Sequence, residues 1–61
     1  MDGLKAEKGV RGWSLRTPDR DTVVNREGFV VWFTSKAKAI AAAPAVKHDT
    51  REDWLVYDGP V

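Results

Sequence analysis

The chain lacks cysteine and has a single histidine among its 61 residues, and these absences remove whole classes of chemistry. Without cysteine there are no disulfides, and one histidine falls far short of the ligand set of a structural zinc site. A Ser-His or Cys-His pair would need His48 as its base, yet His48 sits in a polar stretch between Lys47 and Asp49, where solvation is the expected state. We therefore expect neither a metal nor nucleophilic catalysis.

Glycine-rich phosphate loops and facing carboxylates are missing as well. The five glycines are scattered and do not form the loop of a P-loop or dinucleotide fingerprint. Two close pairs of acids fit turn chemistry and loop solvation better than acid–base catalysis, because so small a domain has little room for a cleft. These pairs are Asp19 with Asp21 and Glu52 with Asp53. The sequence predicts no cofactor and no enzymatic activity.

Long apolar runs and a strong charge imbalance are also absent. No apolar run approaches the roughly 18 residues of a membrane span, and the opening "MDGLKAEKGV" has no apolar centre of the kind found in signal peptides. The net charge of +1 is too small to argue for nucleic-acid binding from composition. A hydrophobic content of 43% with 31% charged residues is typical of a soluble globular protein. We expect a cytoplasmic protein that does not enter membranes.

What is present is a short chain that is rich in aromatic residues. A domain of about 60 residues buries only about 60% of the surface that its unfolded chain exposes, and chains below roughly 70 to 80 residues usually need a disulfide, a metal or a partner subunit. The stability of this chain must therefore come from tight packing or from self-association. Three tryptophans, two phenylalanines and one tyrosine bring large areas for burial, so a compact monomer and a homodimer both stay open.

The order of polar and apolar residues predicts a single small α+β domain over residues 12–61. Residues 1–11 are polar and aperiodic, and we expect them to form a flexible N-terminal arm. Alternating, β-branched and aromatic residues separated by turn residues then predict three strands of an antiparallel meander. These strands cover residues 12–17, 22–25 and 29–33. Before the third strand, "NREG" fits a type I turn in which Gly28 adopts a left-handed conformation.

A short helix and a last strand complete the order β-β-β-α-β. The run "KAKAIAAA" has high helix propensity, the hydroxyl of Thr34 or Ser35 is suited to cap its start, and Pro44 ends it. The side of the helix that we expect to face the sheet is formed by Ala37, Ile40 and Ala41. Residues 44–52 are predicted to be a loop, and "DWLVYDGP" the last strand, pairing beside either the first strand or the third.

The same order resembles that of short uncharacterised bacterial and phage domains. Those domains have a tryptophan-bearing strand, a strand ending in Phe-x-Thr, a helix with Ala-Ile and further alanines, and a strand ending in Asp-Gly. The matching residues here are Trp13, Phe33-Thr34 or Phe33-Thr34-Ser35, Ala39-Ile40, Ala42, Ala43 and "WLVYDG". Pro44 makes the helix shorter, and "PDRDTVVNREG" is longer than in that pattern. The resemblance implies a fold and no particular activity.

The strand "FVVWF" is apolar on both faces, although one helix covers only one face. Phe29, Val31 and Phe33 point to one side and are expected in the core, while Val30 and Trp32 point to the other. An exposed tryptophan beside valines is typical of a protein contact. Alternatively, the N-terminal arm, the loop at 44–52 or packing within that face covers Trp32.

The start of the helix is a second candidate site. Ser35, Lys36 and Lys38 lie beside free backbone amides, which suits an anion such as a nucleic-acid phosphate. The helix dipole disfavours lysines there by at most about 1 kcal/mol each. Ordinary solubilising lysines on a solvated face are therefore the alternative.

Taken together, these features predict a non-catalytic interaction module. It forms a homodimer or docks on a partner protein through the face that contains Val30 and Trp32. The alternative is a small nucleic-acid-binding protein in which tryptophan stacks on bases and lysine and arginine contact phosphates. The near-neutral charge favours the first function.

Overall fold

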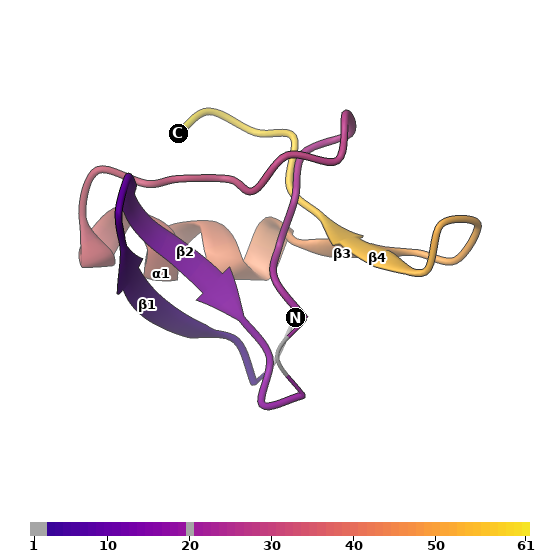
Figure 1. The fold of residues 1–61 in the computed structure, drawn as a ribbon, viewed down its shortest axis with the longest axis horizontal. Coiled ribbons are helices and arrows are strands. Elements are labelled where there is room, and N and C mark those ends of the chain that lie inside the picture. The colour runs from indigo at the N-terminus through magenta and orange to yellow at the C-terminus, as the bar shows by residue number, and fades with distance from the viewer. Residues whose placement is uncertain (1–2, 20) are drawn as a thin grey trace.

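The computed structural model describes residues 3–19 and 21–61, which form two β-hairpins, one α-helix and one turn of 3-10 helix. Figure 1 shows helix α1 running behind the hairpin β1–β2, with the hairpin β3–β4 projecting beyond the other end of the helix. The small α+β class is thus confirmed. The elements are β1 Lys5–Gly9, β2 Gly12–Arg16, α1 Lys36–Ala42, the 3-10 turn η1 Ala43–Ala45, β3 Lys47–Asp49 and β4 Trp54–Val56.

The hairpin β1–β2 lies partly in the region predicted to be a flexible arm. Residues 5–9 pair in antiparallel register with β2, from Lys5 opposite Arg16 to Gly9 opposite Gly12. The sequence gives no sign of β1 because nearly all of its side chains are exposed, so no apolar alternation marks it. Only Ala6 is partly buried against the core. Backbone pairing with β2 therefore defines β1. Residues 1 and 2 of the predicted arm lie outside the described residues.

The predicted three-stranded meander is not present as a regular sheet. Its three segments are neighbours in the predicted order, but only through isolated antiparallel bridges. The third segment also returns to the first, because Trp13 and Phe33 exchange two backbone hydrogen bonds of 2.7 and 2.8 Å. Residues 29–33 are thereby fixed against both preceding segments. The two bridges within the predicted order are Arg16 with Thr22 and Val24 with Val30.

The last strand has neither of the partners considered from the sequence. β4 pairs with β3, so the predicted loop at 44–52 contains the end of η1 and the strand β3, which the sequence does not indicate because "KHD" has no apolar residue. On its other side, the chain meets the second predicted strand in parallel. The Val24 N–H donates to the Leu55 carbonyl at 2.8 Å, and the Tyr57 N–H donates to the Val24 carbonyl at 2.9 Å.

Helix α1 begins and ends close to where the sequence predicts. Of the two candidate caps, Ser35 caps the helix, since its Oγ accepts a hydrogen bond from the Lys38 backbone N–H at 3.2 Å. The α-helical part ends at Ala42, and Pro44 lies within η1, where the helix tightens before the chain extends again.

The side that α1 turns to the core is opposite to the predicted one. Ala39 and Ala42 are 0% and 6% exposed, whereas Ile40 is 55% exposed. Ala37 and Ala41, the other residues of the predicted apolar side, also lie at the surface. The helix packs against β1 and β2 over a core that already holds large side chains, so methyl groups fit there and an isoleucine is turned outward. The buried apolar residues are Leu15, Val23, Val31, Phe33, Ala39, Ala42, Val46, Leu55, Val56 and Tyr57.

Candidate interaction surface

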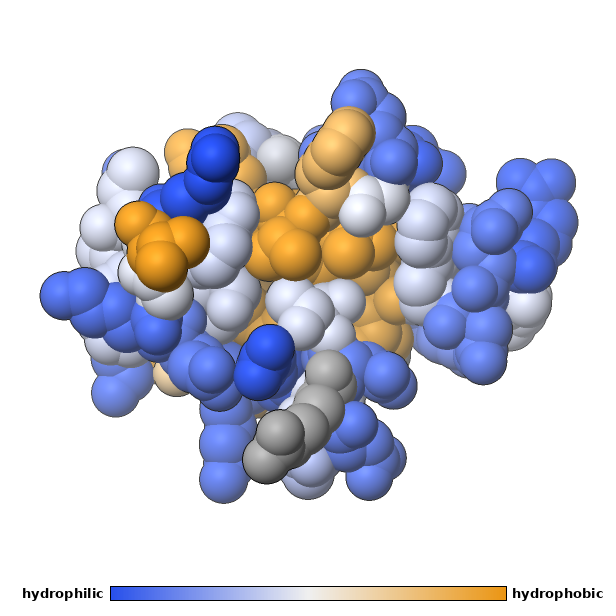
Figure 2. All heavy atoms as spheres, viewed as in Figure 1, coloured by the Kyte–Doolittle hydropathy of each residue, from blue (hydrophilic) through white to orange (hydrophobic). Residues whose placement is uncertain are grey.

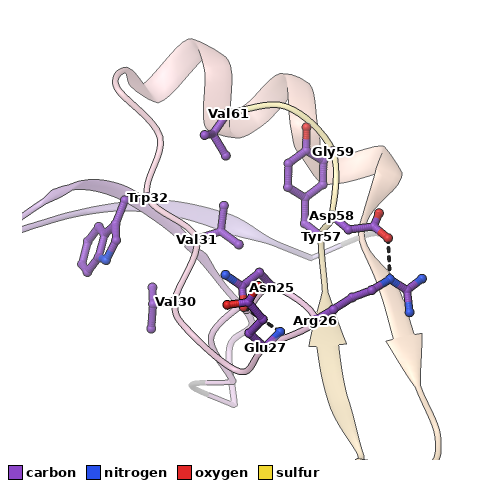
Figure 3. Close-up of a pocket in the computed structure, with 10 residues that line it drawn as sticks. All are labelled: Asn25, Arg26, Glu27, Val30, Val31, Trp32, Tyr57, Asp58, Gly59 and Val61. Carbon is purple, nitrogen blue, oxygen red and sulfur yellow. Dashed lines mark hydrogen bonds and ion pairs between the residues drawn. The ribbon is translucent and has the colours of Figure 1, made fainter.

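Residues 29–33 carry apolar side chains on both sides of one extended segment. Val31 and Phe33 are 6% and 0% exposed, as predicted for core residues. Figure 3 shows Val30 and Trp32 projecting from the other side of the segment, while Val31 lies on the side of Tyr57. Val30 is 36% exposed and Trp32 is partly buried. The two predicted protein-contact residues therefore share one side of the segment and reach solvent.

Phe29 departs from the predicted core and adds to this surface, since 67% of it is exposed. The cause is the turn before it. Asn25 donates its backbone N–H to the Phe29 carbonyl at 2.8 Å, and its Oδ1 accepts from the backbone N–H groups of Glu27 and Phe29 at 2.9 and 3.0 Å. Gly28 completes the turn with φ +90°, the left-handed conformation predicted for it. Phe29 follows this tight turn too closely for its ring to reach the core.

The ring of Trp32 is partly covered by the turn of the hairpin β1–β2. Gly9 lies so close to it that a Cβ atom placed on this glycine would be 2.6 Å from Cζ3 of the indole. Part of the predicted arm thus does contact Trp32, which is partly buried. The contact with Gly9 holds the ring in place at the surface.

Two hollows adjoin at Val30 and Trp32. One, of about 500 Å³, is completed by Arg11 and Phe29. The other, of about 390 Å³, has Val61 from the chain end on its opposite wall, and Figure 3 shows its lining. Figure 2 shows hydrophobic residues gathered near the centre of the face in view, with hydrophilic residues around them.

An ion pair forms part of the rim of the second hollow. Arg26 Nε lies 2.6 Å from Asp58 Oδ2, and both side chains are exposed. The hydrogen bond from this guanidinium, helped by its positive charge, lowers the pKa of Asp58 below its ordinary value of 3.8. The rim therefore carries both signs of charge, unlike the basic stripe that follows a nucleic-acid backbone.

The backbone of residues 29–33 is paired along one edge only. Its odd-numbered residues form hydrogen bonds of 2.7–3.2 Å with the two preceding segments. Val30 and Trp32 make no backbone hydrogen bond within the part of the chain that the structure describes. Because successive residues of an extended segment direct their N–H and C=O groups to opposite edges, these two residues leave donors and acceptors along a free edge. "FVVWF" also lacks charge and proline, which usually protect such an edge.

The second predicted site, at the start of α1, is organised as a helix cap. The hydrogen bond from the Lys38 N–H occupies Ser35 Oγ, and the side chains of Lys36 and Lys38 are exposed. The fold alone accounts for Ser35 at this position. The two lysines extend into solvent from the first turn of a seven-residue helix.

His48 and the acids near it lie on the hairpin β3–β4. His48 Nε2 is 3.0 Å from Asp53 Oδ1, with both side chains exposed. The Arg51 backbone N–H donates to Asp49 Oδ1 at 3.0 Å and lowers the pKa of this carboxyl group below 3.8. Within residues 3–19 and 21–61, no three histidine or acidic side chains are grouped as a metal ion requires. The same residues contain no helix of sufficient length and hydrophobicity to cross a bilayer.

Two features of the surface escape sequence reasoning. The exposure of Phe29 follows from its place directly after the "NREG" turn, a signal that was available in the sequence. The free edge of Val30 and Trp32 depends on which segments pair, and only its lack of charge and proline is visible beforehand.

Comparison with protein-family models, curated proteins and solved structures finds no match to this chain. The resemblance to short bacterial and phage domains therefore stays a prediction.

Proposed function

We propose that this chain is a small non-catalytic interaction module that contacts another protein molecule through Phe29, Val30 and Trp32. These three residues are called the Trp32 surface below. The observation that carries the proposal is that Phe29 is 67% exposed and Val30 36% exposed beside Trp32, which is partly buried. Such a group of large apolar side chains on a small protein is typical of a contact site.

The energetics of the Trp32 surface favour binding. Burying apolar area contributes about 25 cal/mol per Å², and each aromatic side chain offers roughly 150–250 Å² in all, part of which is still exposed here. Gly9 restricts the Trp32 ring, and the turn at Asn25 fixes the backbone of Phe29. Little conformational entropy is then lost on binding, which is the advantage of a preorganised surface.

Site-specific photo-crosslinking tests the proposal. A benzoylphenylalanine replaces Phe29 in one variant and Ile40, which is 55% exposed on α1, in a matched control. Both variants are irradiated in an extract of the cells that naturally express the protein. We expect one defined protein adduct from position 29 and none at that mass from position 40. Excess unlabelled wild type should suppress the adduct, whereas excess Trp32→Ala should not.

Equal labelling from both positions, or an adduct that Trp32→Ala suppresses as well as wild type does, would contradict the proposal. Adducts with nucleic acid alone, weakened by salt, would instead support the alternative of a small nucleic-acid-binding protein.

A further inference from the structure

The free edge of residues 29–33 selects an extended backbone as its partner. Val30 and Trp32 leave N–H and C=O groups without hydrogen bonds within the described residues, and a β-strand is the element that satisfies such a row. Resting on the function proposed above, we infer that the strand comes from a second copy of this chain. The two copies pair antiparallel, about a two-fold axis that passes by Val31.

The backbone geometry suits this register. With Val31 on the axis, Val30 of each copy lies opposite Trp32 of the other. Both residues direct their donors and acceptors to the free edge, so each of the two opposed pairs exchanges two hydrogen bonds. A shift of the register by one residue would bring to the interface the Val31 N–H, which already donates to the Val23 carbonyl, so such a shift is disfavoured.

The side chains are also self-complementary about the axis. "FVVWF" is close to a palindrome centred on Val31, and antiparallel pairing places the exposed Val30 beside the Trp32 indole of the second copy. A β-branched residue opposite an aromatic one is a favourable cross-strand pair, worth roughly 0.2–1 kcal/mol relative to two alanines. The two-fold symmetry forms this pair twice.

Sedimentation equilibrium over a concentration series tests the inference. We expect wild type to dimerise and Val30→Lys to raise the dissociation constant at least tenfold, because a charged side chain blocks the edge. The matched control Ile40→Lys adds the same charge at a residue that is 55% exposed on the outer side of α1 and should stay within twofold of wild type. Far-ultraviolet circular dichroism establishes that each variant is folded.

A wild type that stays monomeric at millimolar concentration, or a Val30→Lys variant that dimerises as strongly as wild type, would overturn the inference. If position 29 still crosslinks to a different protein and Trp32→Ala fails to compete, the proposed function stands while self-pairing fails.

Discussion

Gly12 holds the most demanding position in the fold, and its replacement by alanine tests how residues 29–33 are anchored. Its φ is +129°, and a Cβ at this position would lie 2.4 Å from the Phe33 carbonyl oxygen. Positive φ of this kind costs a residue with a Cβ roughly 1–3 kcal/mol. The oxygen would also have to retreat by about 1 Å, breaking the 2.8 Å hydrogen bond from the Trp13 N–H, which contributes about 1 kcal/mol.

We therefore expect Gly12→Ala to lower the free energy of unfolding by about 2–4 kcal/mol. This is a large share of the roughly 3–9 kcal/mol typical of a chain of this size. Urea unfolding followed by circular dichroism measures the loss, and the midpoint should fall by about 2–4 M at a slope near 1 kcal/mol per M.

Gly3→Ala is the matched control for Gly12→Ala. Gly3 also has positive φ, +86°, but a Cβ there would meet nothing within 4 Å. It should cost only the backbone strain, about 1 kcal/mol. A Gly12→Ala variant that loses no more stability than Gly3→Ala would refute the close approach of Phe33 to Gly12.

Three further predictions concern the helix and the surface charges. Ser35→Ala should reduce stability by about 0.5–2 kcal/mol in thermal or urea unfolding, while Thr34→Ala, whose hydroxyl makes no cap, should change it little; equal losses would contradict the assigned cap. Ile40→Ser should change the free energy of unfolding little because Ile40 is 55% exposed, whereas Ala39→Val should lower it by about 1–3 kcal/mol through overpacking. A larger loss for Ile40→Ser than for Ala39→Val would instead support the helix side predicted from the sequence. Arg26→Ala should raise the pKa of Asp58 towards 3.8 in a carboxyl titration followed by NMR; because the folded-state pKa lies below the ordinary value, the stabilisation from this ion pair is present above about pH 4 and is lost as pH falls through the folded pKa. An unchanged Asp58 titration in Arg26→Ala would exclude the ion pair in solution.

The sequence predicted most of the features that a local interaction decides, with the exposure of Phe29 after its turn as an exception. The cap at the start of α1, its end before Pro44 and the turn closed by Gly28 all depend on residues a few positions apart. The sidedness of Val31 and Phe33 follows from strand alternation alone.

Long-range pairing explains what the sequence could not predict. β1 and β3 consist of mostly exposed polar residues, so only their partners make them strands. The placement of the last strand beside Val24, and the rotation that turns Ile40 outward, depend on which segments fill the core. The sequence predicted Val30 and Trp32 as a surface pair, whereas their free backbone edge follows from the same long-range pairing.

Amide hydrogen exchange of wild type at low and high protein concentration tests the central claim most directly. The N–H groups of Val30 and Trp32 have no acceptor within the described residues, so they should exchange fast in dilute solution and slow down as the concentration rises. The Val24 N–H, bonded to the Leu55 carbonyl at 2.8 Å, serves as an internal control that should be protected at every concentration. Amide exchange rates of Val30 and Trp32 that do not depend on protein concentration would contradict the pairing of two copies along this edge.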